Sequence, residues 1–193
     1  LIDHVPELAI ADILGSTEGG MGQSIMTKDT PASETAKFTL LPVAKVLLPD
    51  GSREVAPGSG EVGMVAQGGM VPLGYYKDPE KSAKTFKEVD GKRYAFIGDM
   101  ATVEADGTIN LLGRGSNCIN TGGEKVFPEE VEEVLKLHPD VADALVFGLE
   151  DERFGNRVAG VVSLEQGGTA EAGDILEATR KLLASYKLPK DLL

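Results

Sequence analysis

The sequence predicts an α+β protein with a β-rich first part and a smaller second part that mixes helices and strands. Short runs of β-branched and aromatic residues, separated by Asp-Gly and proline turns, fill residues 1–113 and predict strands. Beyond residue 117, the order helix, strand, strand, helix is typical of an α+β unit. Between these parts, residues 113–124 are rich in glycine, and we expect an irregular segment and a domain junction there. We therefore expect two domains, over residues 1–113 and 117–193.

The first part is predicted to consist of strands joined by turns. Residues 11–14 predict a short buried strand, and residues 15–20 a glycine-bearing loop. A polar, proline-bearing loop is expected over residues 28–37. Pro49-Asp50-Gly51 predicts a tight reversal, because proline fixes φ and Asp-Gly favours a turn. Further strands are expected over residues 38–48 with an interruption at Pro42, and over 60–68, 94–97, 101–104 and 108–112, the last after a turn at Asp106-Gly107.

A helix is predicted over residues 79–86. Asp78 is suited to the N-cap, and Pro79 occupies the first helical position, where its missing N–H costs nothing. This helix is the main α element expected in the first part.

The second part is predicted to hold two helices and two strands. One helix begins at Pro128 and is stopped by Pro139. Strands follow over residues 144–149 and 158–164. Asp174 is expected to cap the other helix, whose apolar face comprises Ile175, Leu176, Leu182, Leu183 and Tyr186.

Composition narrows the class of partner. The chain carries 19 Lys and Arg against 31 Asp and Glu, a net charge of −12, so we expect no nucleic acid or anionic membrane as a main partner. The sequence starts at Leu1 in what looks like the middle of a folded domain, without signal-peptide features or an integral membrane segment. Cys118, the single cysteine, cannot form an internal disulfide. A cytoplasmic protein is expected, and its oligomeric state is left open.

Gly15-Ser16-Thr17-Glu18 directly follows a predicted strand. A glycine lets the backbone approach a ligand, a threonine hydroxyl can donate to phosphate, and a glutamate can hold Mg²⁺. Taken alone, the pattern favours an ordinary loop.

Three other places could bind parts of a nucleotide or its acceptor. Asp99, expected in a turn after Gly98, could accept both hydroxyls of a ribose, although a turn aspartate bound to its own backbone is the commoner case. Arg114 offers a planar fork for phosphate or ribose oxygens, although a surface arginine is commoner. The loop at 121–125 permits a ligand to lie against backbone, although a flexible linker explains it too.

An acidic run follows this loop. Glu129-Glu130 and Glu132-Glu133 are interpreted as the solvated face of the helix that begins at Pro128, placed favourably for the helix dipole. They are not expected to act as catalytic carboxylates.

The order and spacing of the motifs are more specific than any one of them. The succession G-S-T-E, G-Y-Y-K-D-P-E-K-S-A-K-T-F, Y-A-F-I-G-D and L-L-G-R-G-S-N-C-I-N-T-G-G-E-K-V-F-P-E-E-V-E resembles the adenylate-forming (AMP-binding) superfamily, from Asp12 to Pro189. Its form is most similar to bacterial fatty-acyl-CoA ligases. The resemblance implies that the first part is the end of a large AMP-binding domain, including a β-rich subdomain. The second part would be most of the small C-terminal domain.

The resemblance also implies site residues. Gly15, Ser16 and Thr17 would bind the ATP phosphates, and Glu18 would coordinate Mg²⁺. The remaining roles fall to residues further along the chain: Asp99 and Arg114 at the ribose or phosphate of ATP, Gly19 and Gly20 beside the acyl group, Gly115 and Ser116 at the hinge, and Thr121, Gly122, Gly123, Glu124 and Lys125 along the CoA tunnel.

Members of this family activate a carboxylic acid with ATP, giving an acyl-adenylate and pyrophosphate, and then transfer the acyl group to CoA. The implied substrates are a small-molecule carboxylic acid, ATP and CoA. A medium- or long-chain fatty acid is the default, and an alicyclic or steroid-derived acid is an alternative. An acceptor thiol on a carrier-protein phosphopantetheine, or a non-catalytic binding module of the same fold, are the other interpretations.

Three departures from the family pattern qualify these expectations. Leu14 stands where the family usually has an aromatic residue that stacks on adenine. The family's phosphate loop lies upstream of this sequence, and the catalytic lysine is expected beyond Leu193, so neither Lys187 nor Lys190 is assigned that role. We therefore expect no catalytic residue within the chain, and no activity of the chain by itself.

Overall fold

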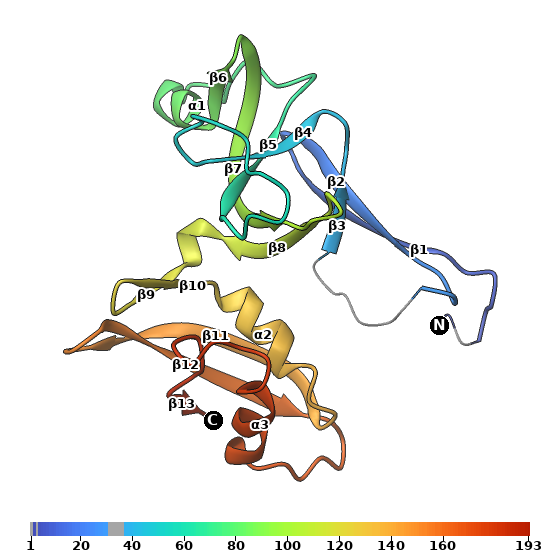
Figure 1. Cartoon of the computed structure of the whole chain (residues 1–193), viewed down its shortest axis with the longest axis vertical. Helices are drawn as coiled ribbons and strands as arrows, with labels where there is room; N and C mark the ends of the chain where they lie inside the picture. The colour runs from blue at the N-terminus through green and yellow to red at the C-terminus, as the bar shows by residue number, and fades with distance from the viewer. Residues whose placement is uncertain (1, 3, 31–36) are drawn as a thin grey trace. The chain divides into compact units, whose positions relative to one another are not determined.

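The computed structural model describes residue 2, residues 4–30 and residues 37–193. It separates into two compact units, Leu1–Leu112 and Gly113–Leu193, and each is described by itself (Figure 1). Both units combine strands with short helices, which confirms the predicted α+β class.

The first unit is built on an antiparallel sheet. Its strands are β1 (Ile10–Ser16), β2 (Gly19–Met26), β3 (Lys37–Leu40), β4 (Ala44–Leu47), β5 (Gly63–Gln67), β6 (Phe86–Val89), β7 (Lys92–Val103) and β8 (Ile109–Arg114). The order is β1-β2-β3-β8-β7-β5-β4, and β6 pairs with β7. Fully buried side chains of Met21, Val46, Val65 and Ile109 form the centre of its core.

Local turn chemistry explains several elements of this unit. Pro42 interrupts residues 38–48 between β3 and β4, as predicted. Gly51 has a φ of +77° and donates its N–H to the carbonyl of Leu48 at 2.7 Å, which confirms the predicted reversal. Asp78 accepts a hydrogen bond from the N–H of Lys81 and caps α1 (Pro79–Thr85), as expected.

Three expectations for the first unit are wrong in detail. Residues 11–14 do form a strand, but only Leu14 is buried, because β1 pairs with β2 alone and lies at the edge of the sheet. The segment 15–20 is a tight hairpin between β1 and β2, and not a loop. Residues 94–97 and 101–104 belong to one continuous strand, β7, and not to two. Of the loop expected over 28–37, residues 31–36 lie outside the described residues.

The second unit packs two helices with a sheet. It contains a 3₁₀ turn η1 (Gly115–Asn117), β9 (Ile119–Thr121), β10 (Glu124–Val126), α2 (Pro128–Leu135), β11 (Val141–Asp151), β12 (Gly155–Leu164), α3 (Ala172–Thr179) and β13 (Asp191–Leu192). The sheet order is β10-β9-β12-β11, with β13 parallel to β12. Val131 and Leu135 from α2 and Ile175 from α3 join Val146 and Val158 of the sheet in one core cluster.

Two expectations for this unit are corrected. Residues 113–124 are not irregular throughout, because β9 and β10 form a hairpin whose turn residues Gly122 and Gly123 both have positive φ, as two-residue hairpin turns require. The N-cap of α3 is Glu171, so Asp174 lies inside the first turn, and α3 ends at Thr179, before Leu182. No helix among the described residues is long and apolar enough to cross a membrane.

Candidate functional site

The Gly15–Glu18 segment forms the tip of the β1–β2 hairpin. Gly15 and Ser16 end β1, Thr17 and Glu18 make the turn, and Gly19 begins β2. The Ser16 hydroxyl accepts the N–H of Glu18 at 3.2 Å, which fixes the turn locally. The Thr17 hydroxyl donates to Oε2 of Glu18 at 2.9 Å, so the two polar side chains lie together at an exposed tip.

Tyr75 contacts this tip from far along the chain. Its hydroxyl donates to Oε1 of Glu18, a contact between residues separated by 57 positions. This hydrogen bond is the main reason that the pKa of Glu18 falls from 4.5 to about 2, with smaller contributions from the Ser16 and Thr17 hydroxyls acting against partial burial. The same bond raises the pKa of Tyr75, because it stabilises the protonated phenol. Glu18 is therefore a carboxylate at neutral pH.

Gly19 and Gly20 follow the turn, and Gly19 is tightly packed. A Cβ at Gly19 would lie 2.7 Å from Nε2 of Gln67, and the φ of Gly19 is +150°. Gln67 ends β5, is buried, and donates Nε2 to the carbonyl of Gly68 at 2.9 Å, while its Oε1 has no partner within the described residues. A Cβ at Gly20 would meet only Leu41, at an ordinary 3.4 Å. Sequence reasoning gave no role to Gln67.

Asp99 lies in a bulge and not in a turn. The register pairs Met64 with Met100 and Ala66 with Phe96, so residues 97–99 of β7 stand opposite Val65 alone. Gly98 has a φ of +100°, which allows the extra residues to fit without ending the strand. The Asp99 side chain is buried, on the strand next to β5, whose last residue packs on Gly19. Bulges of this kind are common next to active sites because they redirect a side chain.

Arg114, Gly115 and Ser116 lie at the start of the second unit. Arg114 ends β8 and is exposed, and Gly115 begins the 3₁₀ turn that also contains Ser116. The Ser116 hydroxyl lies 3.2 Å from Oδ1 of Asn117. The predicted hinge residues therefore form a short turn between a strand and a hairpin.

Glu129 holds this turn from α2, which corrects the interpretation of the acidic run as a solvated face. Oε1 of Glu129 accepts the N–H of Arg114 and Nδ2 of Asn117, both at 3.4 Å. Its Oε2 is buried without a partner within the described residues, and a Cβ at Gly113 would lie only 2.2 Å from it.

Other members of the acidic run are engaged as well. Glu132 accepts the N–H of Val146 at 2.7 Å, and Glu130 accepts Lys187 Nζ through both oxygens, at 2.5 and 2.7 Å. Lys187 is thus an ion-pair partner of α2, consistent with leaving it without a catalytic role.

The segment 121–125 forms the β9–β10 hairpin and borders a groove. Gly122 donates its N–H to the carbonyl of Phe154 at 2.9 Å, while Glu124 and Lys125 are exposed on β10. The groove has a volume of about 640 Å³ and lies within the second unit. Its lining residues are Thr121, Gly122, Glu124, Asp151, Phe154, Arg157, Ser185, Tyr186, Lys190 and Asp191.

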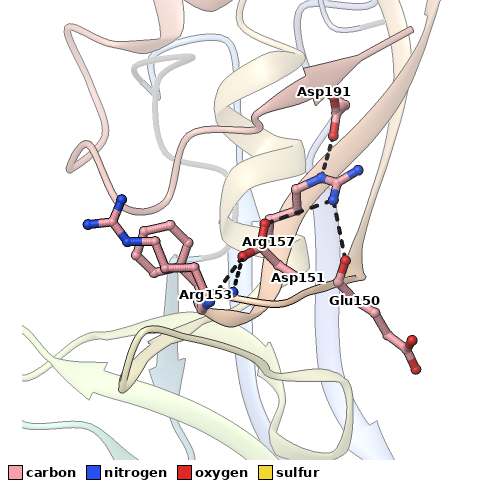
Figure 2. Close-up of polar contacts among 6 residues, drawn as sticks. Glu150, Asp151, Arg153, Arg157 and Asp191 are labelled. Atoms are coloured by element: carbon pink, nitrogen blue, oxygen red, sulfur yellow. Dashed lines mark hydrogen bonds and ion pairs between the residues drawn. The ribbon is translucent and has the colours of Figure 1, made fainter.

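Arg157 is the best-anchored cation of this groove (Figure 2). Its Nε donates to Oδ2 of Asp191 at 2.7 Å, and its Nη1 donates to the carbonyl of Glu150 at 3.3 Å and lies 3.9 Å from Asp151. Asp151 in turn accepts the N–H groups of Arg153 and Phe154, both at 3.0 Å, and thereby shapes the β11–β12 turn. The groove therefore combines a fixed arginine, an aromatic ring and a glycine backbone.

The expected site residues fall into two groups. Thr17, Glu18 and Gly19 lie together, and Asp99 lies in the same sheet. Arg114 and residues 115, 116 and 121–125 belong to the second unit. Sequence reasoning missed Tyr75, Gln67 and Glu129, although Tyr75 is part of the G-Y-Y-K-D-P-E motif.

Known proteins with similar sequences are CoA ligases. The family model of the AMP-binding enzyme C-terminal domain matches residues 130–193. The 3-oxocholest-4-en-26-oate–CoA ligase of Rhodococcus rhodochrous is 47% identical over 98% of this chain and 34% of its own length. The medium/long-chain-fatty-acid–CoA/3-oxocholest-4-en-26-oate–CoA ligase of Mycobacterium tuberculosis H37Rv is 45% identical over 100% of this chain and 35% of its own length. The chain thus spans about a third of the length of these relatives.

Solved structures of adenylate-forming enzymes share the fold. ATP-bound MatB from Rhodopseudomonas palustris matches with a TM-score of 0.77 and 29% identity, over 95% of this chain and 36% of that one. The amide bond synthetase McbA from Marinactinospora thermotolerans matches with a TM-score of 0.78 and 26% identity, over 94% and 36%.

Proposed function

Because this chain belongs to the adenylate-forming (AMP-binding) superfamily, we propose that it is part of an acyl-CoA ligase. In this proposal residues 1–113 are the end of the large AMP-binding domain, and residues 117–193 are most of the small C-terminal domain. The enzyme activates a carboxylic acid with ATP and transfers the acyl group to CoA, releasing AMP and pyrophosphate. The similarity to CoA ligases over 98–100% of the chain carries the proposal.

In the first half-reaction, an oxygen of the substrate carboxylate attacks the α-phosphorus of ATP and pyrophosphate leaves. We assign Gly15, Ser16 and Thr17 to the phosphates, because the Thr17 hydroxyl is exposed at a hairpin tip next to a carboxylate. Asp99 is assigned to the ribose hydroxyls, which its carboxylate can accept as a pair. Arg114 is assigned to the ribose or phosphate oxygens, where a guanidinium stabilises negative charge.

The donors at the hairpin tip fit Mg²⁺. This ion prefers hard oxygen ligands and is commonly held by one or two carboxylates together with substrate phosphates. Glu18 supplies one ionised carboxylate there, and no cluster of three or more His, Cys, Asp or Glu that could hold a metal occurs within the described residues. Bound Mg²⁺ would neutralise charge that builds on the phosphate oxygens.

For the second half-reaction we propose that the small domain rotates about Gly115 and Ser116 and that the CoA thiol attacks the acyl carbon, releasing AMP. Residues 121–125 would line the path of the pantetheine arm. Support comes from the groove beside Thr121 and Gly122, in which backbone without side chains adjoins Arg157. Gly19 and Gly20 are assigned to the acyl pocket, where absent side chains leave space for substrate.

The names of the similar ligases favour a medium- or long-chain fatty acid or a steroid side-chain acid as substrate. A full-length protein containing this chain can be supplied with ATP, Mg²⁺, CoA and a panel of octanoate, palmitate and 3-oxocholest-4-en-26-oate. Pyrophosphate release and acyl-CoA detected by mass spectrometry are expected with at least one acid. Acid-dependent pyrophosphate release without acyl-CoA would refute CoA as the acceptor.

A second candidate is an adenylating enzyme with another acceptor, since the structurally similar McbA is an amide bond synthetase. Adding a phosphopantetheinylated carrier protein or an amine to the same assay separates these cases, because only the true acceptor consumes the adenylate. A non-catalytic module of the fold would release no pyrophosphate with any acid. The 193-residue chain alone is proposed to be inactive, which the same assay tests.

A further inference from the structure

The contact between Tyr75 and Glu18 joins two motifs that are far apart in the sequence. Tyr75 belongs to the segment that leads into α1, while Glu18 is at the tip of the β1–β2 hairpin. The Tyr75 hydroxyl donates to Oε1 of Glu18. Both residues belong to the first unit, so the contact is internal to one compact body.

Tyr75 itself is held on several sides. Its N–H donates to the Ser82 hydroxyl at 2.7 Å, and that hydroxyl donates to the carbonyl of Asp78 at 2.6 Å. Its ring lies 5.2 Å from that of Phe86, at an angle of 44°, and Lys81 Nζ lies 4.4 Å from the ring centroid. A hydroxyl on a ring fixed in this way is a rigid donor, and α1 provides the rigidity.

The two oxygens of Glu18 are therefore not equivalent. Oε1 is bound to Tyr75, whose ring is fixed, whereas Oε2 accepts only the hydroxyl of Thr17, at 2.9 Å. Thr17 is exposed, and its hydroxyl can rotate to another acceptor at little cost. A ligand approaching the hairpin tip can take Oε2 and the Thr17 hydroxyl without disturbing the bond to Tyr75.

We propose that Tyr75 is a positioning residue for adenylation: it fixes Oε1 of Glu18 and leaves Oε2, with the Thr17 hydroxyl, for the nucleotide and its metal ion. This inference rests on the proposed function. The terminal torsion of a glutamate has broad minima, so a carboxylate without such a partner would sample many orientations at an exposed tip. Ordering it before the ligand arrives lowers the cost of binding.

The neighbouring tyrosine provides a matched control. Tyr76 is 88% exposed and has no hydrogen bond to Glu18. In the full-length protein, Y75F and Y76F each remove one hydroxyl and keep the ring. We expect Y75F to raise the Mg²⁺ concentration for half-maximal pyrophosphate release about tenfold, the factor that loss of one hydrogen bond to a charged group gives, while the rate at saturating Mg²⁺ falls less. Y76F is expected to leave both quantities unchanged.

A second measurement needs neither metal nor nucleotide. Urea unfolding of the metal-free protein is compared for wild type, Y75F, E18Q and the double variant, and in parallel for Y76F with E18Q. A coupling between the first pair, and none between the second, is expected because only Tyr75 touches Glu18.

The outcomes are distinct. If Y75F shifts the Mg²⁺ dependence no more than Y76F does, or lowers the rate equally at all Mg²⁺ concentrations, the inference is overturned. If no acid in the panel causes the wild-type protein to release pyrophosphate, the proposed function fails and the unfolding cycle stands alone. Coupling between Tyr75 and Glu18 then supports the placement of the carboxylate, and its absence overturns it.

Discussion

Replacing Lys187 by methionine tests whether this lysine stabilises the second unit or takes part in chemistry. Lys187 Nζ lies 2.5 and 2.7 Å from the two oxygens of Glu130, and the two side chains are 19% and 21% exposed. Methionine keeps much of the aliphatic stem and removes the charge. Glu130 would then remain as a half-buried carboxylate without its cation.

The magnitude follows from this partial burial. Exposed ion pairs contribute about 0.2–1 kcal/mol, whereas removing one partner of a fully buried pair costs about 3–5 kcal/mol. A pair that is one-fifth exposed lies between these limits, so we expect K187M to lower the free energy of unfolding by about 2 kcal/mol. In a unit of this size, that corresponds to a fall of roughly 8–16 °C in the melting temperature.

The assay is a double-mutant cycle. Wild type, K187M, E130Q and the double variant are unfolded in urea, and opening of the second unit is followed by amide hydrogen exchange within α2. A coupling of about 1–2 kcal/mol is expected between the two residues. K181M, at an exposed lysine, is the matched control and should change stability little.

The functional arm uses the full-length protein below its melting temperature. Loss of a cation that stabilises the transition state lowers the rate by about 10²–10³-fold, whereas a purely structural change lowers it much less. We expect K187M to keep its adenylation rate within about threefold of wild type. Unchanged stability together with a hundredfold loss of rate would refute the reasoning.

Three further predictions concern other parts of the chain. G19A should lower the unfolding free energy by about 1–3 kcal/mol in urea, because its Cβ would meet Gln67 at 2.7 Å and its φ is +150°, whereas G20A should have little effect; equal effects would contradict this. D140A should destabilise the protein by about 1–2 kcal/mol and speed amide exchange at residues 169–170, whose N–H groups Asp140 accepts at 3.0 Å, and D174A serves as the control. Burial raises the pKa of the Cys118 thiol, so less thiolate exists at pH 8 and a disulfide reagent should modify native protein more slowly than unfolded protein, with equal rates as the contradicting result.

Sequence reasoning succeeded where the cause is local. Asp78 and Pro79 start α1, and Pro42 separates β3 from β4 as expected. Gly51 reverses the chain in the same way. Each of these outcomes depends on the φ preference or side-chain acceptor of a residue within the turn itself, so a short window of sequence contains the whole cause.

The errors have non-local causes. Asp99 was expected in a turn, since Gly98 favours one, but pairing of β7 with β5 on both sides of the glycine absorbs the extra residues as a bulge. Glu130 was expected to be solvated, because Lys187 is 57 positions away and nothing nearby in the sequence indicates the pair. The Tyr75–Glu18 contact spans the same separation and was missed for the same reason.

The distribution of these misses has a consequence for Glu129. As a helix residue near an N-terminus, it was fully explained by the helix dipole, so sequence reasoning had no cause to look further. In the structure its carboxylate also accepts the Arg114 N–H and lies over Gly113, in the segment proposed as the hinge. Any rotation about Gly115 and Ser116 that moves Arg114 away from α2 must break this contact. Glu129 therefore contributes to the free-energy difference between hinge conformations, and E129Q, which weakens the acceptor and keeps its shape, should change the rate of acyl transfer relative to adenylation.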